Sequence, residues 1–205
     1  MKKILKVVGV ALCLVAFTQN SKAQFNVGLD VSMPMGNFGE VYGIGFGGSA
    51  GYDHAIGDKM KIGGQVGLLR FGGKNDDDGV SPYYKYYTSS TSLMLIPILG
   101  NFKYYFSDNT NGFYSSVSIG MSMYKYKNET SYTVSEWSGW DANYDPIYQD
   151  VKYSNDNSFN KTYLTYAVGV GYLINEKMDF GLRYTIVAGE GGSLAHLNLR
   201  AAYNF

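Results

Sequence analysis

The sequence predicts an all-β fold, an eight-stranded antiparallel up-and-down β-barrel that crosses a membrane. Stretches of the chain alternate between apolar and polar side chains, which is the period of a β-strand. Tyr, Phe and Gly are abundant, with 20, 11 and 26 copies among 205 residues. Beyond a short leader there is no run of ~18 apolar residues, so a membrane-spanning helix is not expected. A chain that crosses lipid with strands must close them into a barrel, because every backbone polar group needs a partner there.

The leader occupies residues 1–23 and is predicted to be a secretory signal peptide. Lysines precede an apolar segment at 7–17, and small residues fit a cleavage site after Ala23. The apolar segment is too short to span a bilayer. Cys13 lies inside it, and the leucine before this cysteine argues against lipidation. The predicted mature domain, residues 24–205, therefore has no cysteine for disulfides, thiol chemistry or cysteine metal sites.

Charge and motifs exclude several classes of partner. The mature domain has 13 basic and 17 acidic residues, a net charge of −4, which gives no reason to expect nucleic acid binding. The acidic run Asp76-Asp77-Asp78 lacks the spacing of a calcium-binding loop and is expected to be a solvated loop. No cofactor or metal site is predicted.

The strands follow from the alternation. They are expected at residues 25–33, 42–56, 60–71, 92–106, 113–126, 163–174, 178–187 and 195–205. Short turns follow the even-numbered strands, at 57–59, 107–111 and 175–177. Longer loops follow the odd-numbered strands, at 34–41, 72–90, 127–160 and 188–193. Short periplasmic turns and long extracellular loops are typical of outer-membrane barrels. Pro97 in the fourth strand is expected to mark a bulge or bend, because proline cannot donate to the ladder.

Residue size indicates which face of the sheet points outward. The polar face is crowded with Gly, Ser, Ala and Thr, which suit the narrow interior of an eight-stranded barrel. The apolar face is large and aromatic, as a lipid-facing surface should be, and aromatic residues collect near the short-turn rim as in an interfacial girdle. A lipocalin-like barrel would need the opposite arrangement.

Seven charged side chains are expected in the lumen by this parity. They are Asp30, Asp53, Lys61, Lys103, Asp179, Arg183 and Arg200. Buried charges must be paired, so we expect an internal network of ion pairs and hydrogen bonds that fills the barrel. Arg183 and Arg200 are expected to pair with Asp30 or another inward acid. The alternative is a polar conduction path, for which eight strands leave little room.

Two further sets of residues could carry a function. Ser193 and His196, with Glu190 nearby, could be read as a hydrolytic site, but no nucleophile motif surrounds the serine and residues three apart on a strand face opposite sides. No catalytic residue is predicted.

The longest loop offers a recognition surface, with candidates Trp137, Trp140, Tyr144 and Tyr148 among several acids. The alternative is that these aromatic side chains pack on each other. Residues 131–137 and 147–153 also alternate and are predicted to form a ribbon above the membrane.

The closing stretch, Ala195–Phe205, alternates and stops on an aromatic residue. It resembles the last strand of Gram-negative outer-membrane barrels, and residues 96–106 resemble a recurring segment of small barrels. Over residues 24–205 the chain resembles the OmpA/OmpX-like family. The resemblance implies a Gram-negative outer membrane, lipid as the surrounding partner, and a terminal signal (Tyr203 and Phe205) read by the barrel-assembly machinery.

Three function classes follow from that resemblance. The first is a structural or surface-interaction role through the extracellular loops, with an unidentified extracellular ligand. The second is a narrow pore for small solutes, and the third is an envelope enzyme. Fold alone does not choose among them.

Overall fold

The computed structural model describes residues 23–74, 78–81, 84–107, 111–140, 143–189 and 192–205. The predicted signal peptide up to residue 22, with Cys13, lies outside the described residues. So do Asp76, Asp77 and Glu190.

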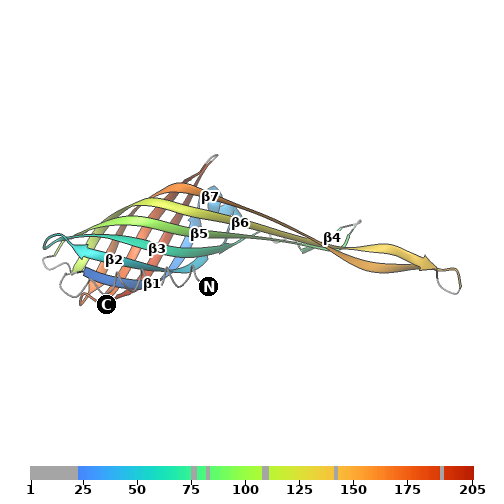
Figure 1. The fold of residues 1–205 in the computed structure, drawn as a ribbon, viewed down its shortest axis with the longest axis horizontal. Helices are drawn as coiled ribbons and strands as arrows, with labels where there is room; N and C mark the ends of the chain where they lie inside the picture. The colour runs from blue at the N-terminus through green and yellow to red at the C-terminus, as the bar shows by residue number, and fades with distance from the viewer. Residues whose placement is uncertain (1–22, 75–77, 82–83, 108–110, 141–142, 190–191) are drawn as a thin grey trace, which may run out of the picture.

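Eight long antiparallel strands form a closed barrel (Figure 1). They are β1 (Ala23–Met35), β2 (Gly45–Ala55), β3 (Met60–Gly72), β5 (Tyr84–Tyr105), β6 (Gly112–Trp140), β7 (Pro146–Ile174), β8 (Met178–Gly189) and β9 (Gly192–Asn204). Each strand pairs with the next along the chain except across the seam, where β1 pairs with β9. A short strand, β4 (Asp78–Ser81), pairs with the start of β5, while β3 pairs with the rest of β5. The predicted eight-stranded up-and-down barrel is confirmed.

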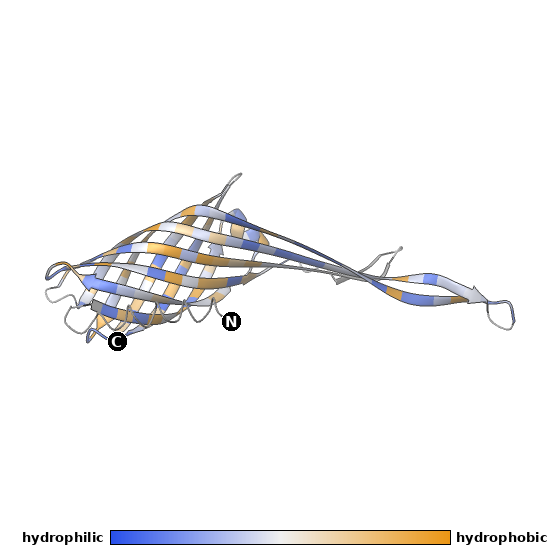
Figure 2. Cartoon of the chain, viewed as in Figure 1, coloured by the Kyte–Doolittle hydropathy of each residue, from blue (hydrophilic) through white to orange (hydrophobic). Residues whose placement is uncertain are grey.

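Side chains alternate between lumen and outer surface along the barrel strands, and Figure 2 shows the matching alternation of hydropathy. On β1, for example, Val27 and Leu29 are exposed on the outer surface, whereas Asn26 and Asp30 are buried inside. Unlike in a water-soluble barrel, the outward row is thus apolar, which suits contact with lipid hydrocarbon.

Exposed aromatic side chains surround the rim that carries the short turns. They are Phe25, Tyr52, Tyr104, Phe106, Phe113, Tyr172, Phe180, Tyr203 and Phe205. Several touch across strands: the rings of Phe113 and Tyr172 lie 4.6 Å apart, and those of Phe25 and Phe205 lie 6.2 Å apart. The arrangement matches an interfacial girdle at one edge of the membrane.

The longest predicted loop is, in the structure, mostly strand. β6 and β7 each run for 29 residues, and their outer halves continue as a ribbon, residues 127–140 and 146–160, that projects far beyond the barrel (Figure 1). The ribbon is two-stranded only beyond Thr133, where the pairing of β5 with β6 ends. The prediction of a loop over all of 127–160 was wrong, while the ribbon predicted from the alternation at 131–137 and 147–153 is present. Beyond Thr133 the two segments pair only with each other, and the backbone N–H and C=O groups on their outer edges are left to hydrogen-bond with water.

Two other predicted loops also contain regular structure. Residues 72–90 include β4 and the first part of β5, whose partner in β6 extends to Thr133. Residues 34–41 include the short helix α2 (Asn37–Val41), and β2 starts only at Gly45. No helix among the described residues is long and apolar enough to span a membrane.

Pro97 does not form a bulge. The pairing register of β5 with β6 is continuous through Pro97 and Ser122, and the register with β3 is the same on both sides of it. The β3–β5 ladder is merely interrupted there, between Val66 and Leu69, because proline offers no N–H to its neighbour.

Candidate functional site

Lys103 lies in the half of the lumen that is nearer the short-turn rim, and its side chain connects several strands. Its Nζ donates to Asp53 Oδ2 and to Asp179 Oδ2, each at 2.9 Å, and so joins β5 to β2 and β8. The Tyr114 hydroxyl donates to Asp179 Oδ1 at 2.6 Å and approaches from β6. All four side chains are buried. Two carboxylates thus share one ammonium group in the barrel interior, which is the pairing that buried charges require.

Arg200 on β9 extends this network to β1 and β2. Its Nη1 lies 3.8 Å from Asp179 Oδ2, its Nη2 donates to Asn26 Oδ1 at 2.7 Å, and its Nε donates to Ser49 Oγ at 2.9 Å. The Ser49 hydroxyl donates in turn to Asp30 Oδ2 at 2.6 Å. Arg200 therefore reaches Asp30 through a serine rather than directly.

The other two predicted lumen cations take neutral partners. Lys61 faces Lys103 across the β3–β5 ladder, and its Nζ donates to Gln24 Oε1 at 2.7 Å. Arg183 Nη1 donates to Gln65 Oε1 at 3.0 Å, and no carboxylate of the described residues lies within ion-pair distance of it. All seven predicted charges thus lie inside the barrel, but Arg183 is not ion-paired with Asp30 as expected.

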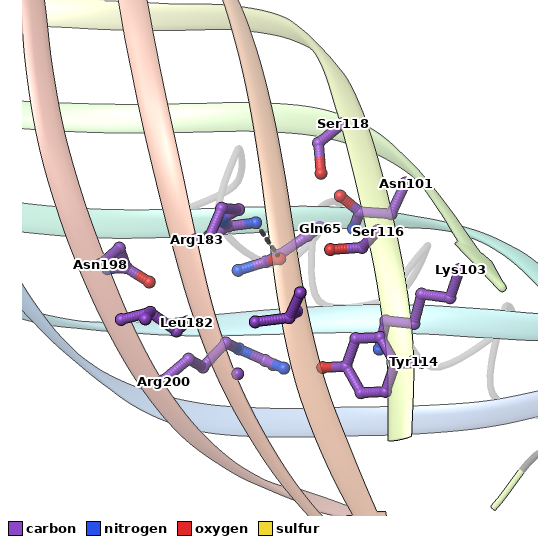
Figure 3. Close-up of a pocket in the computed structure, with 12 residues that line it drawn as sticks. Gln65, Asn101, Lys103, Tyr114, Ser116, Ser118, Leu182, Arg183, Asn198 and Arg200 are labelled. Atoms are coloured by element: carbon purple, nitrogen blue, oxygen red, sulfur yellow. Dashed lines mark hydrogen bonds between the residues drawn. The ribbon is translucent and has the colours of Figure 1, made fainter. Parts of the chain in front are cut away.

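Beside Arg183 and Arg200 the lumen contains a polar cavity of about 40 Å³. Figure 3 shows Gln65, Asn101, Arg183 and Arg200 around it. A water molecule needs roughly 10–15 Å³ by such a measure, so the space suits a few waters. It is not a continuous aqueous path.

The outer mouth of the barrel is closed by apolar side chains that the sequence reading missed. Phe38 of α2 is 3% exposed, and its ring packs at 5.0 Å from Phe71 and 5.2 Å from Tyr42. Leu69, Leu93 and Leu95 complete the cluster from β3 and β5. The strand residues share the inward parity of Lys61 and Lys103, and this parity was the signal that could have identified them. We call this group the outer cap.

The inner end is closed by a smaller group, Tyr105, Tyr114 and Leu173. The two tyrosine rings lie 5.2 Å apart, and Lys61 and Lys103 each place an ammonium group over one of them. Cation–π contacts of this kind stabilise charges that are removed from water. The lumen is thus apolar or aromatic at both ends and ionic between them.

The residues that could be read as hydrolytic do not come together. His196 is buried under the outer cap, with its ring 6.0 Å from that of Phe71, while Ser193 is exposed at the start of β9. Within the part of the chain that the structure describes, no hydrogen bond joins them, and no group of three side chains could hold a metal ion.

The four recognition candidates all lie at the far end of the ribbon. Trp137, Trp140, Tyr144 and Tyr148 are 58%, 60%, 83% and 62% exposed. The tryptophan rings touch edge to face at 6.2 Å, but that contact leaves most of each side chain open to water. The ribbon below them is held by other pairs, such as the stacked rings of Tyr132 and Tyr153.

Hydrogen bonds between side chains also rigidify the ribbon. The Ser135 hydroxyl donates to Asp150 Oδ1 at 2.7 Å, and the Tyr153 hydroxyl donates to the carboxylate of Glu136. The hydrogen bond to Glu136 raises the pKa of Tyr153 above its usual range. These pairs connect the two strands on both faces of the ribbon, so the aromatic end is presented on an ordered support.

The comparison with protein families matches residues 5–205 to the outer membrane protein beta-barrel domain. The chain belongs to this family. Membership of the outer membrane protein beta-barrel family places the protein in the outer membrane of a Gram-negative bacterium, with lipid around its apolar surface. A search of curated proteins finds no match.

Solved structures of small outer-membrane barrels share the fold of this family member. Ail, the attachment invasion locus protein of Yersinia pestis, is 12% identical with a TM-score of 0.54, covering 90% of this chain and 99% of Ail. Ail in complex with the heparin analogue sucrose octasulfate gives 11% identity and a TM-score of 0.56, covering 89% and 97%. OprG from Pseudomonas aeruginosa is 10% identical with a TM-score of 0.42, covering 90% and 97%. At these identities the likeness to Ail concerns the fold.

Proposed function

We propose that the barrel is a membrane anchor and that the ribbon binds an extracellular partner. The observation that carries the proposal is the placement of four large aromatic side chains, all exposed, at the end of a ribbon that projects beyond the barrel. Exposed aromatic groups at one place on a surface commonly mark an interaction site. The ribbon segment of β6, 14 residues long, would span about 45 Å at ~3.3 Å per residue.

The closed lumen favours this role over a narrow pore. The outer cap and the inner aromatic group block both ends, and Lys103, Asp53 and Asp179 occupy the space between them. No enzymatic role is proposed, because Ser193 and His196, the pair considered for hydrolysis, lie apart in the structure.

The structural neighbour Ail offers a contrast in ligand chemistry. It was crystallised with a polysulfated ligand, so a barrel of this fold can carry a binding site. The aromatic end of this ribbon is accompanied by Glu136, Asp145 and Asp150. Their negative charges would repel a polysulfate, so a neutral or cationic surface is the expected partner here.

We propose cleavage of the signal peptide after Ala23 and insertion by the barrel-assembly machinery with Tyr203 and Phe205 as the recognised residues. N-terminal sequencing of the membrane-inserted protein tests the first point: a mature chain that starts at any residue other than Gln24 would contradict it.

A ribbon-shortened variant tests the binding role. Replacing residues 134–151 by an Asn-Gly turn joins the register partners Thr133 and Lys152 and leaves all β5–β6 pairs in place. Wild type and variant in nanodiscs are applied to arrays of glycans, matrix proteins and supported phospholipid bilayers. We expect wild-type binding to at least one class and its loss in the variant. Equal signals for both proteins, or none, would overturn the proposal.

A further inference from the structure

We propose that the end of the ribbon inserts into the interfacial region of a second lipid bilayer that faces the bacterial surface. The inference rests on the proposed function and names its partner class. The residues concerned are Trp137, Trp140, Tyr144, Ile147 and Tyr148, which we call the aromatic tip. All five are exposed.

A register shift builds the aromatic tip. The pairing of β6 with β7 is regular up to Trp137 and Tyr148, then slips by one residue so that Gly139 faces Ile147 and Trp140 faces Pro146. One extra residue reverses the side-chain alternation beyond it, so Trp140 returns to the face that carries Trp137. The two indole rings consequently meet at 6.2 Å.

The shape of the tip argues against the other partner classes. Sites for small ligands are concave, whereas the aromatic tip lies at the free end of a narrow ribbon that projects from the barrel (Figure 1). A stable protein interface buries roughly 800 Å² on each partner, with about 20–30 residues a side. Five side chains at the end of a narrow ribbon fall well short of that. A bilayer surface needs neither a pocket nor a large matched area.

The side chains of the tip are those that lipid interfaces favour. Trp and Tyr concentrate at the level of lipid headgroups, because their rings are apolar and their N–H and O–H groups remain hydrated. Ile147 adds an aliphatic group beside them. Glu136, Asp145 and Asp150 lie near the same end, so a zwitterionic bilayer suits this tip better than an anionic one.

The direction of the ribbon selects a second bilayer rather than the barrel's own. It leaves the barrel at the rim opposite the short turns and continues away from it (Figure 1). Pairing of β5 with β6 as far as Thr133 adds a third strand beside the base of the ribbon, which opposes folding back toward the membrane that holds the barrel.

Tryptophan fluorescence tests the proposal directly, because Trp137 and Trp140 are the two tryptophans of the whole sequence. The full mature protein in nanodiscs is mixed with phosphatidylcholine vesicles, with and without brominated chains. We expect a blue shift on addition of vesicles and quenching by the brominated lipid. Absence of both would overturn the proposal. A blue-shifted spectrum in nanodiscs alone, unchanged by vesicles, would show insertion into the protein's own bilayer and would also overturn it.

Variants distinguish the tip from the rest of the ribbon. We expect Ile147→Ser with Tyr148→Ser to weaken vesicle binding in flotation by roughly tenfold or more. The control Asn155→Ser changes an exposed residue on the same ribbon but outside the tip and should bind as wild type does. A loss of the same size in the control would contradict a site confined to the tip.

Lipid charge gives a second readout. Replacing half of the phosphatidylcholine by phosphatidylglycerol should weaken binding at low salt, and Asp145→Asn should restore part of it. Unchanged or stronger binding to the anionic vesicles would contradict the charge argument. If the nanodisc array shows ribbon-dependent binding to glycans or proteins but vesicles bind nothing, the proposed function stands and the bilayer inference fails.

Discussion

Arg200 and Asp30 are register partners across the β1–β9 seam, and Ser49 connects their side chains. Arg200 Nε donates to Ser49 Oγ at 2.9 Å, and that hydroxyl donates to Asp30 Oδ2 at 2.6 Å. The seam is where the first and last strands must meet to abolish the sheet edges. A relay from β9 through β2 to β1 therefore ties three strands together at the point of closure.

Arg200→Leu should destabilise the barrel by about 3–5 kcal/mol, the usual cost of removing one partner from a buried charged network. It would leave Asn26 and Ser49 without their donor and Asp179 with one cation fewer. Urea unfolding in detergent, followed by heat-modifiable gel migration, measures the change in the free energy of unfolding.

Arg70→Leu is the matched control for this experiment. Arg70 is exposed on the outer surface of β3, so its loss should change stability by less than about 1 kcal/mol. Similar destabilisation by the two substitutions would show that the seam network contributes nothing specific.

Gly171→Ala tests how tightly the inner end is packed. A Cβ at this position would lie 2.3 Å from the Tyr114 hydroxyl and 2.7 Å from the carbonyl oxygen of Phe180. The side chain of Tyr114, whose hydroxyl donates to Asp179, would have to move. Overpacking of this kind costs about 1–3 kcal/mol of stability. Gly100→Ala is the control, because its Cβ would meet nothing closer than 3.6 Å. Equal stability of both variants in thermal unfolding followed by circular dichroism would refute tight packing at Gly171.

The barrel could be predicted from the sequence because its two faces differ at almost every position. Lumen charges such as Asp53 and Lys103 follow from parity once the apolar face is assigned outward. The ion-pair partner of each charge cannot be predicted in the same way. Lys61 and Lys103 are neighbours across the β3–β5 ladder, and the sequence does not state the register of that ladder. In the structure, Lys103 forms ion pairs with both Asp53 and Asp179, whereas Lys61 donates to Gln24.

The outer cap and the full length of the ribbon are two further features that could not be predicted from the sequence. Phe71 has the inward parity, but a polar face was expected to stay polar, and nothing local indicates that Phe38 of a five-residue helix folds onto it. The ribbon is rich in Ser, Asn and Asp, which signal loops. Cross-strand pairs such as Tyr132 with Tyr153 override that preference, and they connect residues 21 apart in the sequence.

Intact cells treated with proteinase should show cleavage within the ribbon while the barrel remains protected. We expect this because the ribbon leaves the barrel at the rim opposite the short turns. Gel analysis of membranes should show barrel fragments that stay associated until they are heated. Cleavage that requires permeabilised cells would place the ribbon on the periplasmic side and invert the topology.

Planar bilayers should show no sustained ion conductance for the wild-type barrel. Phe38 and its neighbours close one end, Tyr105, Tyr114 and Leu173 close the other, and the cavity between them is about 40 Å³. A known porin reconstituted at the same protein-to-lipid ratio is the positive control. Steady channel openings from the purified wild type would revive the narrow-pore alternative.

Phe205→Ala should lower the yield of folded barrel in cells far more than it lowers the stability of barrels already formed. In the folded protein Phe205 is 73% exposed, its N–H donates to the Phe25 carbonyl oxygen at 2.8 Å, and its ring lies 5.1 Å from that of Tyr203. The substitution keeps the backbone hydrogen bond and removes ring contacts at the surface, so the stability of the closed seam should fall by no more than about 1 kcal/mol.

The last strand resembles an assembly signal, which is why the yield in cells should fall. Wild type and Phe205→Ala are compared for membrane-inserted protein in cells and for spontaneous refolding into detergent, where no assembly machinery takes part. Phe113→Ala is the control, because Phe113 is an equally exposed aromatic residue of the same girdle. A fall in cellular yield that is shared by Phe113→Ala, or that is matched by poor refolding in detergent, would leave Phe205 as an ordinary interfacial aromatic.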